Sequence, residues 1–489
     1  MQRFKYDVAI TYIGNMSELP DWVKKHKKKG IAIECRNGRY YATRVTSVWD
    51  PVKKRTRKVT LEYLGVVTPE GIIPPKHKRF SGVECIKEAG NIAFLRYFSD
   101  DVVEHLKKYW PDEWESLLSL AILKLAYGEC LKRMQFRYET SMASEYWPNA
   151  HLSKNTLSSL LERVGSAWGL QRRFFKSLSE IESYMAIDLT QVFSYSENIN
   201  WLESGYNSRD LYMSQLNLLL LWGMNTHVPM FMKLLPGSIH SAKTIVNALY
   251  ESDLRNVILV ADKGFYSNDN VEVLERHNVN YILALKRDLS FVNYPSMDEY
   301  KKYFFYRDSV EWYHEYKWKG RRIIIYLDKK MSAEEEGNFL RRYAAEGKSQ
   351  KRKYEMLKDR FGTLALLTDL GETAEKIYKL YKQRREIEYA FRSMKTTLEA
   401  DKTYMQSREK LQGYFSIIFL ALYIYSKVID HLKRKDIIDK YSVNDILTQL
   451  AKIYIIKLKN KNIITSEIPK KTMELIKLIE IPITKILGR

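Results

Sequence analysis

Residues 381–395 read Tyr-Lys-Gln-Arg-Arg-Glu-Ile-Glu-Tyr-Ala-Phe-Arg-Ser-Met-Lys, within a stretch whose spacing predicts one helix from Ile377 to about Leu398. Four polar side chains of this helix stand at offsets of 0, 3, 7 and 14 residues: Tyr381, Arg384, Glu388 and Lys395. At about 100° per residue, these offsets place the four side chains on one narrow stripe. An acid, two cations and a phenol on a shared face suit a phosphodiester that is held through a metal ion.

Two aspartates upstream of this helix follow apolar segments that read as β-strands. Asp188 ends the segment that begins at Met185, and Asp262 directly follows Val257–Ala261. Because ligand-facing residues gather at strand ends, Asp188 and Asp262 are predicted to form a cup of three carboxylates with Glu388. Such oxygen ligands suit Mg²⁺, and two ions about 3.5–4 Å apart would activate the attacking water or 3′-hydroxyl and stabilise the leaving oxygen. The pattern therefore predicts phosphoryl transfer without a protein nucleophile.

Each of the three acids also has an ordinary structural interpretation when it is taken alone. An aspartate at a strand end most often forms a turn or caps a helix, which would apply to Asp188 and Asp262. A glutamate such as Glu388 most often lies on a solvated helix face. The combination, in this order along the chain and with a phosphate-binding stripe around the glutamate, favours the catalytic interpretation.

With these residues in place, the chain resembles a bacterial insertion-sequence DDE transposase of the group whose signature is Tyr-(2)-Arg-(3)-Glu-(6)-Lys. The segment Asp262-Lys-Gly-Phe265 is similar to the Asp-Arg-Gly-Phe motif around the second aspartate of that group, and Ala186–Thr190 resembles the first. The resemblance covers about Ser183 to Tyr425. It extends more weakly to the N-terminal region, where Tyr63-Leu64-Gly65 is similar to one branch of the group.

Two positions depart from the family pattern. Lys263 replaces the usual arginine, which keeps the charge but loses bidentate geometry. The loop Pro236–Ser241 resembles a Pro-Gly-Asn…Asp element of many relatives but lacks its Asn and Asp. The second departure weakens the case for an auxiliary role of this loop and leaves the three acids unaffected.

The resemblance implies an RNase H-like core in which Asp188, Asp262 and Glu388 are catalytic and hold two Mg²⁺ ions, for which Mn²⁺ can substitute. It also implies that the signature Tyr, Arg and Lys grip the phosphates of DNA ends. The positions that match these roles are Tyr381, Arg384 and Lys395.

Relatives also hold a flipped base on an aromatic residue of an inserted subdomain, and stacking of this kind is worth about 1–3 kcal/mol per base. Four side chains alternate onto one face of a predicted strand in the insertion: Trp312, His314, Tyr316 and Trp318. Packing within the insertion is the favoured interpretation for this set, with one of the two tryptophans, Trp312 or Trp318, a candidate for contact with DNA. Further candidates for backbone contact are Lys263, Arg321, Arg322, Lys351, Arg352 and Lys353.

The composition is consistent with a polyanionic partner. The 489 residues include 80 Lys and Arg against 59 Asp and Glu, which gives a formal net charge of +21. Nucleic acid is the commonest partner of so basic a protein, and a lysine-rich compositional bias is the alternative. Three widely separated cysteines, Cys35, Cys85 and Cys130, form no metal-binding or disulfide pattern and are predicted to be buried or reduced thiols.

No membrane segment is predicted. The sequence MQRFKYDVAI at the start has no apolar signal segment. The most apolar run, Tyr414–Tyr425, is too short to span a bilayer and reads as a buried helix. We therefore expect a cytoplasmic, nucleoid-associated prokaryotic protein.

The predicted fold class is an α/β RNase H-like core, a mixed sheet flanked by helices and interrupted by a β-rich insertion. Three strands, followed by alternating helices and strands, give the order of such a core. A β-rich N-terminal domain, a helical domain and a helical C-terminal tail surround it. The predicted domains are 1–81 (basic, β-rich, a candidate for DNA binding), 82–182 (helical), 183–290 (core, first part), 291–360 (insertion), 361–432 (core, second part) and 433–489 (tail).

In the N-terminal domain, the predicted strands are Tyr6–Tyr12, Ile31–Glu34, Tyr40–Thr46 and Val59–Val66. Two charge runs, Lys24–Lys29 and Lys53–Lys58, stand between them. The second falls where a hairpin tip could reach a DNA backbone, and a solvated loop remains the alternative for either run. In the helical domain, Leu152–Val164 is predicted to be a packing helix rather than a recognition helix.

In the core, the predicted strands are Tyr184–Thr190, Gln215–Trp222, Val228–Leu235, Val257–Ala261 and Tyr281–Leu285, and the predicted helices are Ala242–Tyr250 and Asn270–Arg276. The insertion is expected to contain a hairpin, Val310–Trp318 and Arg321–Leu327, that turns at Lys319-Gly320. Phe361–Leu370 is expected to be a strand that returns to the core.

Taken together, the sequence predicts a Mg²⁺-dependent transposase that binds double-stranded DNA at the inverted repeats of its own element, cleaves there and joins the ends to target DNA. Because both ends must be held together, a homodimer is expected in the synaptic complex. Two rivals stay open: an RNase H-like nuclease that cuts without joining, and a catalytically idle, domesticated DNA-binding protein. A basic RNA-binding protein is a third, although no aromatic motif of the usual modules is present.

Overall fold

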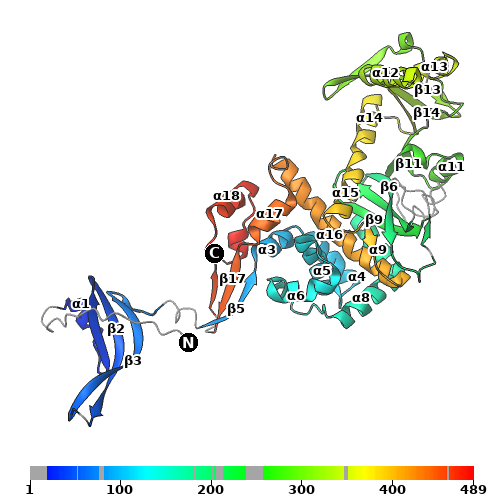
Figure 1. Ribbon diagram of the computed structural model, residues 1–489. Helices are drawn as coiled ribbons and strands as arrows, with labels where there is room; N and C mark the ends of the chain where they lie inside the picture. The colour runs from blue at the N-terminus through cyan, green and yellow to red at the C-terminus, as the bar shows by residue number, and fades with distance from the viewer. Residues whose placement is uncertain are drawn as a thin grey trace. The chain divides into compact units, whose positions relative to one another are not determined.

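The computed structural model forms two compact units, and each is described by itself (Figure 1). The first unit comprises Met1–Ile86 and Ile456–Ile464, and the second comprises Lys87–Ile455 and Thr465–Arg489. The structure describes residues 19–51, 53–75, 82–179, 182–200, 202–204, 213–237, 257–345, 351–459 and 462–488. Three predictions lie partly or wholly outside these residues: the strand 6–12, the helix 242–250 and the loop 236–241.

The first unit contains a four-stranded antiparallel sheet in the order β1-β2-β3-β4. A short helix packs on it, and Val23, Ala42 and Val67 form a small core. The β-rich prediction is confirmed, but the central strands are longer than expected, because β3 begins at Arg55 and takes in the last four of the six residues of the second charge run. The elements are α1 (Asp21–Lys24), β1 (Ile31–Arg36), β2 (Arg39–Asp50), β3 (Arg55–Thr68) and β4 (Gly71–Ile73).

The Tyr63-Leu64-Gly65 motif has a structural explanation in this sheet. Gly65 has a φ of +131°, and a Cβ atom at this position would lie 1.9 Å from the backbone oxygen of Ile73. Only glycine tolerates both that backbone conformation and so close an approach. The glycine of this motif therefore allows β3 to pass close to the end of β4.

A three-stranded sheet in the order β18-β17-β5 joins distant parts of the sequence. Its strands are β5 (Val83–Glu88), β17 (Tyr454–Leu458) and β18 (Ile463–Thr465). The region 82–182 therefore begins with a strand, and the C-terminal tail, expected to be helical, contains two. The tail's helices are α17 (Val443–Leu450), α18 (Lys470–Ile479) and α19 (Ile483–Ile486).

The rest of the region 82–182 is helical, as predicted. Its elements are α3 (Gly90–Tyr97), α4 (Asp100–Tyr109), α5 (Trp114–Tyr127), η2 (Leu131–Arg133), α6 (Met134–Thr140), α7 (Ala143–Tyr146), α8 (Lys154–Ser166) and α9 (Trp168–Ser179). The side-chain oxygen of Ser153 caps α8 by accepting a hydrogen bond from the Thr156 backbone N–H. The apolar face of α8 is buried against α16 (Arg408–Arg434), which confirms the packing interpretation of this helix.

The helix α16 is the central support of the second unit. Among the described residues it is the one helix long and apolar enough to cross a membrane by length and composition, and 72% of its apolar window is buried inside the structure. It has 27 residues and contains the predicted buried run 414–425. It crosses α8 with the two backbones nearly touching, because a Cβ on Gly165 would lie 1.7 Å from the Glu409 oxygen and one on Gly413 would lie 2.1 Å from the Leu161 oxygen.

The large sheet of the second unit is mixed. Along its main path the order is β12-β13-β14-β15-β11-β10-β6-β8-β7, with β9 paired to β8 and β16 to β6. The strands β8 and β9 run antiparallel to their neighbours, whereas β10 is parallel to both β6 and β11. The strands of the core are β6 (Tyr184–Ser194), β7 (Glu203–Ser204), β8 (Ser214–Gly223), β9 (Pro229–Pro236), β10 (Ile258–Ala261), β11 (Asn280–Ala284) and β16 (Lys402–Thr403), with η3 (Lys263–Phe265) and α11 (Asn268–Arg276) after β10.

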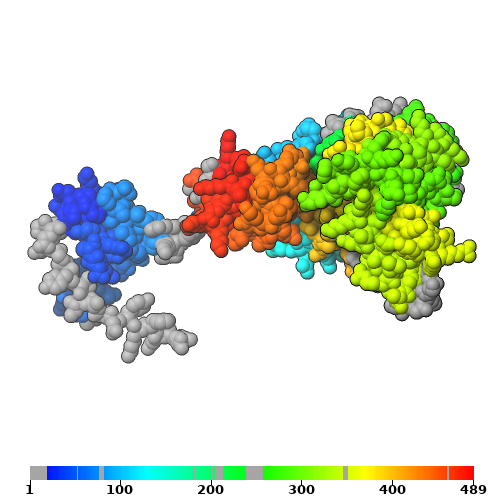
Figure 2. Space-filling view, turned by 90° about the horizontal axis from the view of Figure 1, so that it is seen from above, coloured from blue at the N-terminus to red at the C-terminus, as the bar shows by residue number. Residues whose placement is uncertain are grey.

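The strands of the insertion continue this sheet. The strand β15 pairs antiparallel with β11 on one side and with β14 on the other, so it returns to the core as predicted. The hairpin turns at Lys319 and Gly320, whose φ values of +50° and +79° suit a tight two-residue turn. Figure 2 shows the insertion in green to yellow-green and the second part of the core in yellow to orange. The elements are η4 (Met297–Glu299), β12 (Lys302–Tyr306), β13 (Ser309–Trp318), β14 (Arg321–Asp328), α12 (Lys329–Ala345), α13 (Lys351–Leu357), η5 (Lys358–Arg360) and β15 (Thr363–Thr368).

The helix that carries the signature residues is divided in two. The segments are α14 (Ala374–Gln383) and α15 (Arg385–Thr396), and Arg384 lies between them. The Arg384 backbone N–H bonds to the Tyr381 oxygen at 3.2 Å, and the Ile387 N–H bonds to the Arg384 oxygen at 3.1 Å. These three-residue spacings tighten the chain by a local 3₁₀ turn. The prediction of one continuous helix is therefore wrong at this residue.

Candidate active site

The two aspartates are brought together by the parallel pairing of β6 and β10. Ile187 is level with Ala261 in this pairing, so Asp188 and Asp262 are the next residues along adjacent strands. Asp262 directly follows the end of β10, as expected. Asp188 does not end its strand, because β6 continues to Ser194 and Asp188 itself pairs with Leu220 of β8. The two aspartates therefore lie side by side at the point where β10, the shorter of the two strands, ends.

One guanidinium group links all three predicted catalytic acids. Arg384 Nη1 donates to Asp188 Oδ2 at 3.3 Å, and Nη2 donates to Glu388 Oε1 at 2.8 Å and lies 4.0 Å from Asp262 Oδ1. The Arg384 side chain is only 9% exposed, whereas those of Asp188, Asp262 and Glu388 are 21%, 38% and 50% exposed. The acids therefore line an opening whose floor is the arginine.

Burial and nearby charge shape the titration of this cluster. Burial raises the pKa of Asp188 to about 6, partly opposed by Arg384 and by a hydrogen bond from the Leu189 N–H, while Asp262 and Glu388 add to the rise. Tyr381 donates its hydroxyl to Asp262 Oδ1 at 3.1 Å. Burial and the Asp262 carboxylate raise the pKa of Tyr381, so the phenol stays protonated and remains a donor.

The donor atoms at this site suit a hard divalent cation, and their present arrangement is held by Arg384 instead. Among the residues that the structure describes, no three His, Cys, Asp or Glu side chains are arranged as a ready metal site. The carboxylate oxygens of Asp188, Asp262 and Glu388 are the ligand type that Mg²⁺ prefers. The buried Nε atom of Arg384 has no hydrogen-bond partner in the described part of the chain. An unpaired buried N–H leaves this side chain incompletely satisfied where it stands.

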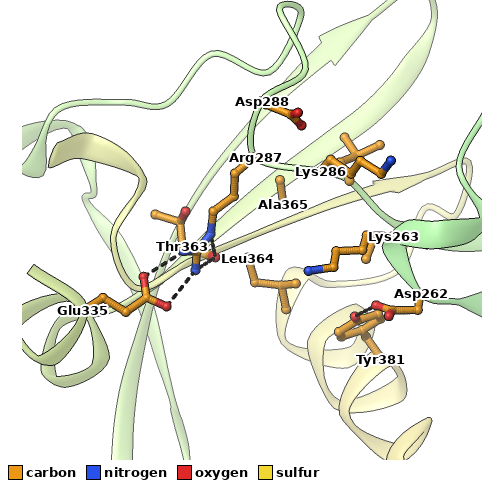
Figure 3. Close-up of a pocket in the computed structure, with 12 residues that line it drawn as sticks. Asp262, Lys263, Lys286, Arg287, Asp288, Glu335, Thr363, Leu364, Ala365 and Tyr381 are labelled. Atoms are coloured by element: carbon orange, nitrogen blue, oxygen red, sulfur yellow. Dashed lines mark hydrogen bonds and ion pairs between the residues drawn. The ribbon is translucent and has the colours of Figure 1, made fainter. Parts of the chain in front are cut away.

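A pocket of about 660 Å³ opens beside Asp262 and Tyr381 (Figure 3). Three cationic residues line it, from the ends of two adjacent strands: Lys263, Lys286 and Arg287. Arg287 is committed to Glu335, at 2.7 Å, and to the Thr363 oxygen. Lys263 and Lys286 are exposed. The pocket thus offers two ammonium groups next to the acidic cluster.

Sequence reasoning named Lys263 for DNA contact and missed Lys286. The signal was present, because Lys286 directly follows the strand predicted over Tyr281–Leu285. The strand-end argument that identified Asp262 applies to it equally.

The other signature cation, Lys395, lies apart from the cluster. It is half-buried on α15, seven residues after Glu388, which corresponds to about 10 Å along the helix axis. The structure therefore brings Tyr381, Arg384 and Glu388 together and places Lys395 farther along the same element.

Three of the five candidate DNA contacts of the insertion have partners within the protein. Arg321 pairs with Glu275 through two hydrogen bonds of 2.8 and 2.9 Å, and Arg322 bonds to Glu315 at 2.9 Å. On α13, Lys353 donates to the Tyr343 hydroxyl at 2.6 Å, whereas Lys351 and Arg352 are exposed.

The aromatic row on β13 is also engaged. Trp318 stacks on Phe291 with ring centroids 4.1 Å apart, and Trp312 lies between Tyr303, at 5.1 Å, and the Lys329 ammonium, at 4.1 Å. The Tyr316 hydroxyl donates to the Phe291 oxygen at 3.2 Å, and its ring lies 6.2 Å from that of His314. These contacts agree with the favoured interpretation that the row packs within the insertion.

The three cysteines are free thiols, and among the described residues no disulfide joins them. Cys35 and Cys130 are exposed and Cys85 is half-buried.

Residues 185–424 match the family model of the transposase DDE domain. This segment, just under half of the chain, contains Asp188, Asp262, Glu388 and the insertion between the second and third acids. The chain therefore carries a segment that matches the DDE domain of transposases. The match confirms the predicted class, and the Tyr-Arg-Glu-Lys subgroup stays a prediction.

No curated protein matches the sequence at a significant level. Among solved structures, the cryo-EM structure of the piggyBac transposase synaptic complex with hairpin DNA has a TM-score of 0.40 and 9% identity, over 74% of this chain and 79% of that chain. The catalytic domain of Mos1 mariner transposase has a TM-score of 0.15 and 12% identity, over 51% and 96%. Similarities of this size carry no argument about the present chain.

Proposed function

We propose that this protein is a DDE transposase of the Tyr-Arg-Glu-Lys group that binds the terminal inverted repeats of its own insertion sequence, cleaves there and transfers the ends. The observation that carries the proposal is the convergence of Asp188, Asp262 and Glu388 on one guanidinium within the DDE segment. The three carboxylates come from β6, from the residue after β10 and from α15, so they meet only in the folded chain.

The sheet supports an RNase H-like core. Its strands β9, β8 and β6 are joined antiparallel, and β10 and β11 follow in parallel on the other side of β6. This is the order of three strands followed by alternating elements that the sequence predicts. In this sheet Asp188 lies on β6, and Asp262 directly follows the neighbouring strand β10.

Asp188, Asp262 and Glu388 would hold two Mg²⁺ ions, or Mn²⁺ in their place. When bound, these ions supply activation of the attacking oxygen and stabilisation of the leaving oxygen. Arg384 would exchange its carboxylate partners for phosphate oxygens, to which a guanidinium binds in a bidentate manner. Tyr381, which keeps its proton, orients Asp262.

The cations around the cluster would position the DNA strand. Lys263 and Lys286 line the adjoining pocket and suit the phosphates next to the one that reacts. Lys395, farther along α15, suits a phosphate about 10 Å away. The partners are element ends and target DNA in a homodimeric synaptic complex in the cytoplasm.

The test of this proposal uses the DNA that flanks the gene. The full-length protein is incubated with Mg²⁺ and a duplex that spans each predicted end, together with a supercoiled target plasmid. We expect strand cleavage at the repeat boundary and covalent joining of the 3′ ends to the target. Cleavage without joined products would favour a nuclease, and specific binding of the flanks without cleavage would favour an idle DNA-binding protein.

The raised pKa of Asp188 gives a pH dependence to metal binding. A divalent cation needs the ionised carboxylate, so its apparent affinity should fall about tenfold for each pH unit below about 6. We expect Mg²⁺ to raise the melting temperature clearly at pH 8 and hardly at pH 5, as measured by thermal unfolding across a series of metal concentrations.

Without metal, the ionisation of Asp188 should lower the stability of the folded protein as the pH rises. This is opposite to the effect of pH on metal binding. Because the folded pKa of Asp188 lies above its unfolded value, the folded state holds this proton more tightly, and the resulting stability is complete below about pH 4 and lost as the pH rises through about 6. The variant Asp188→Asn should remove both trends. A Mg²⁺ affinity independent of pH in the wild-type protein would contradict the assignment.

A further inference from the structure

Part of the hairpin formed by β2 and β3 has no neighbouring strand among the residues that the structure describes. The strand β1 pairs with β2 only as far as Arg44, and β4 pairs with β3 only over Val66–Thr68. Beyond these points Thr46–Asp50 pair with Arg55–Val59, with no third strand from the described part of the chain, and we call this part the distal ribbon. In Figure 1 the two strands extend past the rest of the first unit. The ribbon is held in place because its two strands continue into the four-stranded sheet, and both of its faces are left available to a partner.

The base of the distal ribbon is bent by two bulges. In the β2–β3 register, Leu64 is skipped between the partners of Ala42 and Thr43, and Leu61 is skipped between those of Arg44 and Val45. Each extra residue bends the strand and increases its twist. A strongly twisted ribbon therefore fits into a helical groove better than it fits against a flat surface.

The ribbon and its turn are strongly cationic on every side. Five cations stand at the turn and on β3: Lys53, Lys54, Arg55, Arg57 and Lys58. The side chains of all five are exposed. The one acid of the ribbon, Asp50, lies opposite Arg55 and accepts a hydrogen bond from the Lys53 backbone N–H at 3.1 Å. In the cross-strand register, Lys58 lies opposite Ser47, and Arg57 lies opposite Val48. Because neighbouring residues of a strand point to opposite faces, positive charge lies on both faces as well as at the tip.

Exposed apolar side chains accompany this charge. Trp49 is 59% exposed and Val48 is 44% exposed, and they point to opposite faces of the ribbon. Two residues on a free ribbon add little to the stability of the sheet while they stay in water. The apolar side chains of Val48 and Trp49 could contact base edges or sugars if the ribbon lay within a groove of nucleic acid.

We propose that the distal ribbon inserts into the major groove of duplex DNA, with Arg55, Arg57 and Lys58 on the phosphates of both groove walls and Trp49 against the interior of the groove. The B-form major groove is about 12 Å wide and admits a two-stranded ribbon. A groove meets both faces and the tip at once, whereas a membrane or a flat protein surface meets one face. The inference rests on the proposed function and names the surface through which the first unit holds DNA.

The experiment measures equilibrium binding of the full-length protein to a labelled duplex of about 30 base pairs from the gene's flanks, in metal-free buffer so that no cleavage occurs. The test variant is Arg55→Gln/Arg57→Gln/Lys58→Gln. The matched control is Lys25→Gln/Lys28→Gln/Lys29→Gln, which removes the same charge from exposed residues of the same unit. Affinity is recorded over a range of salt concentrations.

We expect the ribbon variant to lose about tenfold or more in affinity and to lower the slope of log K against log salt by about 2 to 3, since each lost phosphate contact lowers it by about 0.9. The control should keep the wild-type slope. A second variant, Trp49→Ala, should weaken binding without changing the slope. An equal loss in the control, or an unchanged slope in the ribbon variant, would overturn the proposal.

Competition experiments distinguish duplex DNA from other ligands of the distal ribbon. Duplex RNA should compete poorly, because its A-form major groove is too deep and narrow for a ribbon. Strong competition by duplex RNA, or sedimentation with phosphatidylserine vesicles that the ribbon variant alone loses, would assign the surface to another ligand and refute the inference. If the wild type binds duplex DNA through the ribbon but never cleaves with Mg²⁺, the proposed function fails alone. If the ribbon variant binds with the wild-type slope and still cleaves, this inference fails alone.

Discussion

Replacing Glu388 by glutamine should abolish DNA cleavage and leave DNA binding intact. The change removes one negative charge from the three-acid cluster and keeps the size of the side chain. Transition-state stabilisation by a correctly held metal is worth several kcal/mol, so the cleavage rate should fall at least about a thousandfold. Single-turnover cleavage of the flanking duplex, with binding measured in parallel, checks this result.

The matched control is Glu375→Gln. Glu375 lies on α14, is likewise partly exposed and pairs with Lys379 at 2.6 Å, outside the cluster. It should cleave at nearly the wild-type rate. If Glu388→Gln cleaves as fast as the control, Glu388 is not a metal ligand and the three-acid assignment is wrong.

The second large effect concerns stability. Gly413→Ala should destabilise the second unit, although alanine is the better helix former. The new Cβ would lie 2.1 Å from the Leu161 oxygen and 2.8 Å from its Cα, both of them backbone atoms of α8. Overpacking of this kind costs about 1–3 kcal/mol or more, because the two helices must separate. Thermal or urea unfolding measures the loss.

Gly169→Ala provides the comparison. Gly169 lies in α9, and nothing comes within 4 Å of a Cβ built there. This change should be neutral or stabilising by up to about 1 kcal/mol. Equal stability of the two variants would mean that α8 and α16 do not cross at the close distance described.

The meeting of the three acids was predictable from sequence because each part has a local signature. Apolar runs that end in Asp, together with the offsets from Tyr381 to Glu388, identify acids on neighbouring elements. The parallel register then makes Asp188 and Asp262 adjacent, although one of them lies inside its strand. The helix break at Arg384 was not predictable, since no proline or glycine marks it and the residue keeps a helical backbone.

The pairing of strands that lie far apart in the sequence was also not predictable. The strands β5 and β17 lie in one small sheet although about 370 residues separate them in sequence, and neither carries a strong alternating pattern. The same applies to β15, whose sequence predicts a strand but does not show that it connects the insertion to the core by pairing on both sides. Such partnerships depend on which edges meet in three dimensions.

The position of Arg384 among the three acids couples two binding events. In the metal-free protein its positive charge balances Asp188 and Glu388 directly. Drawing the guanidinium toward a phosphate leaves those carboxylates without their counter-charge, which increases their affinity for cations, and reciprocity requires cations to increase the affinity for the phosphate. DNA and metal should therefore bind with positive cooperativity. The three carboxylates would then bind metal most tightly when DNA already occupies the site.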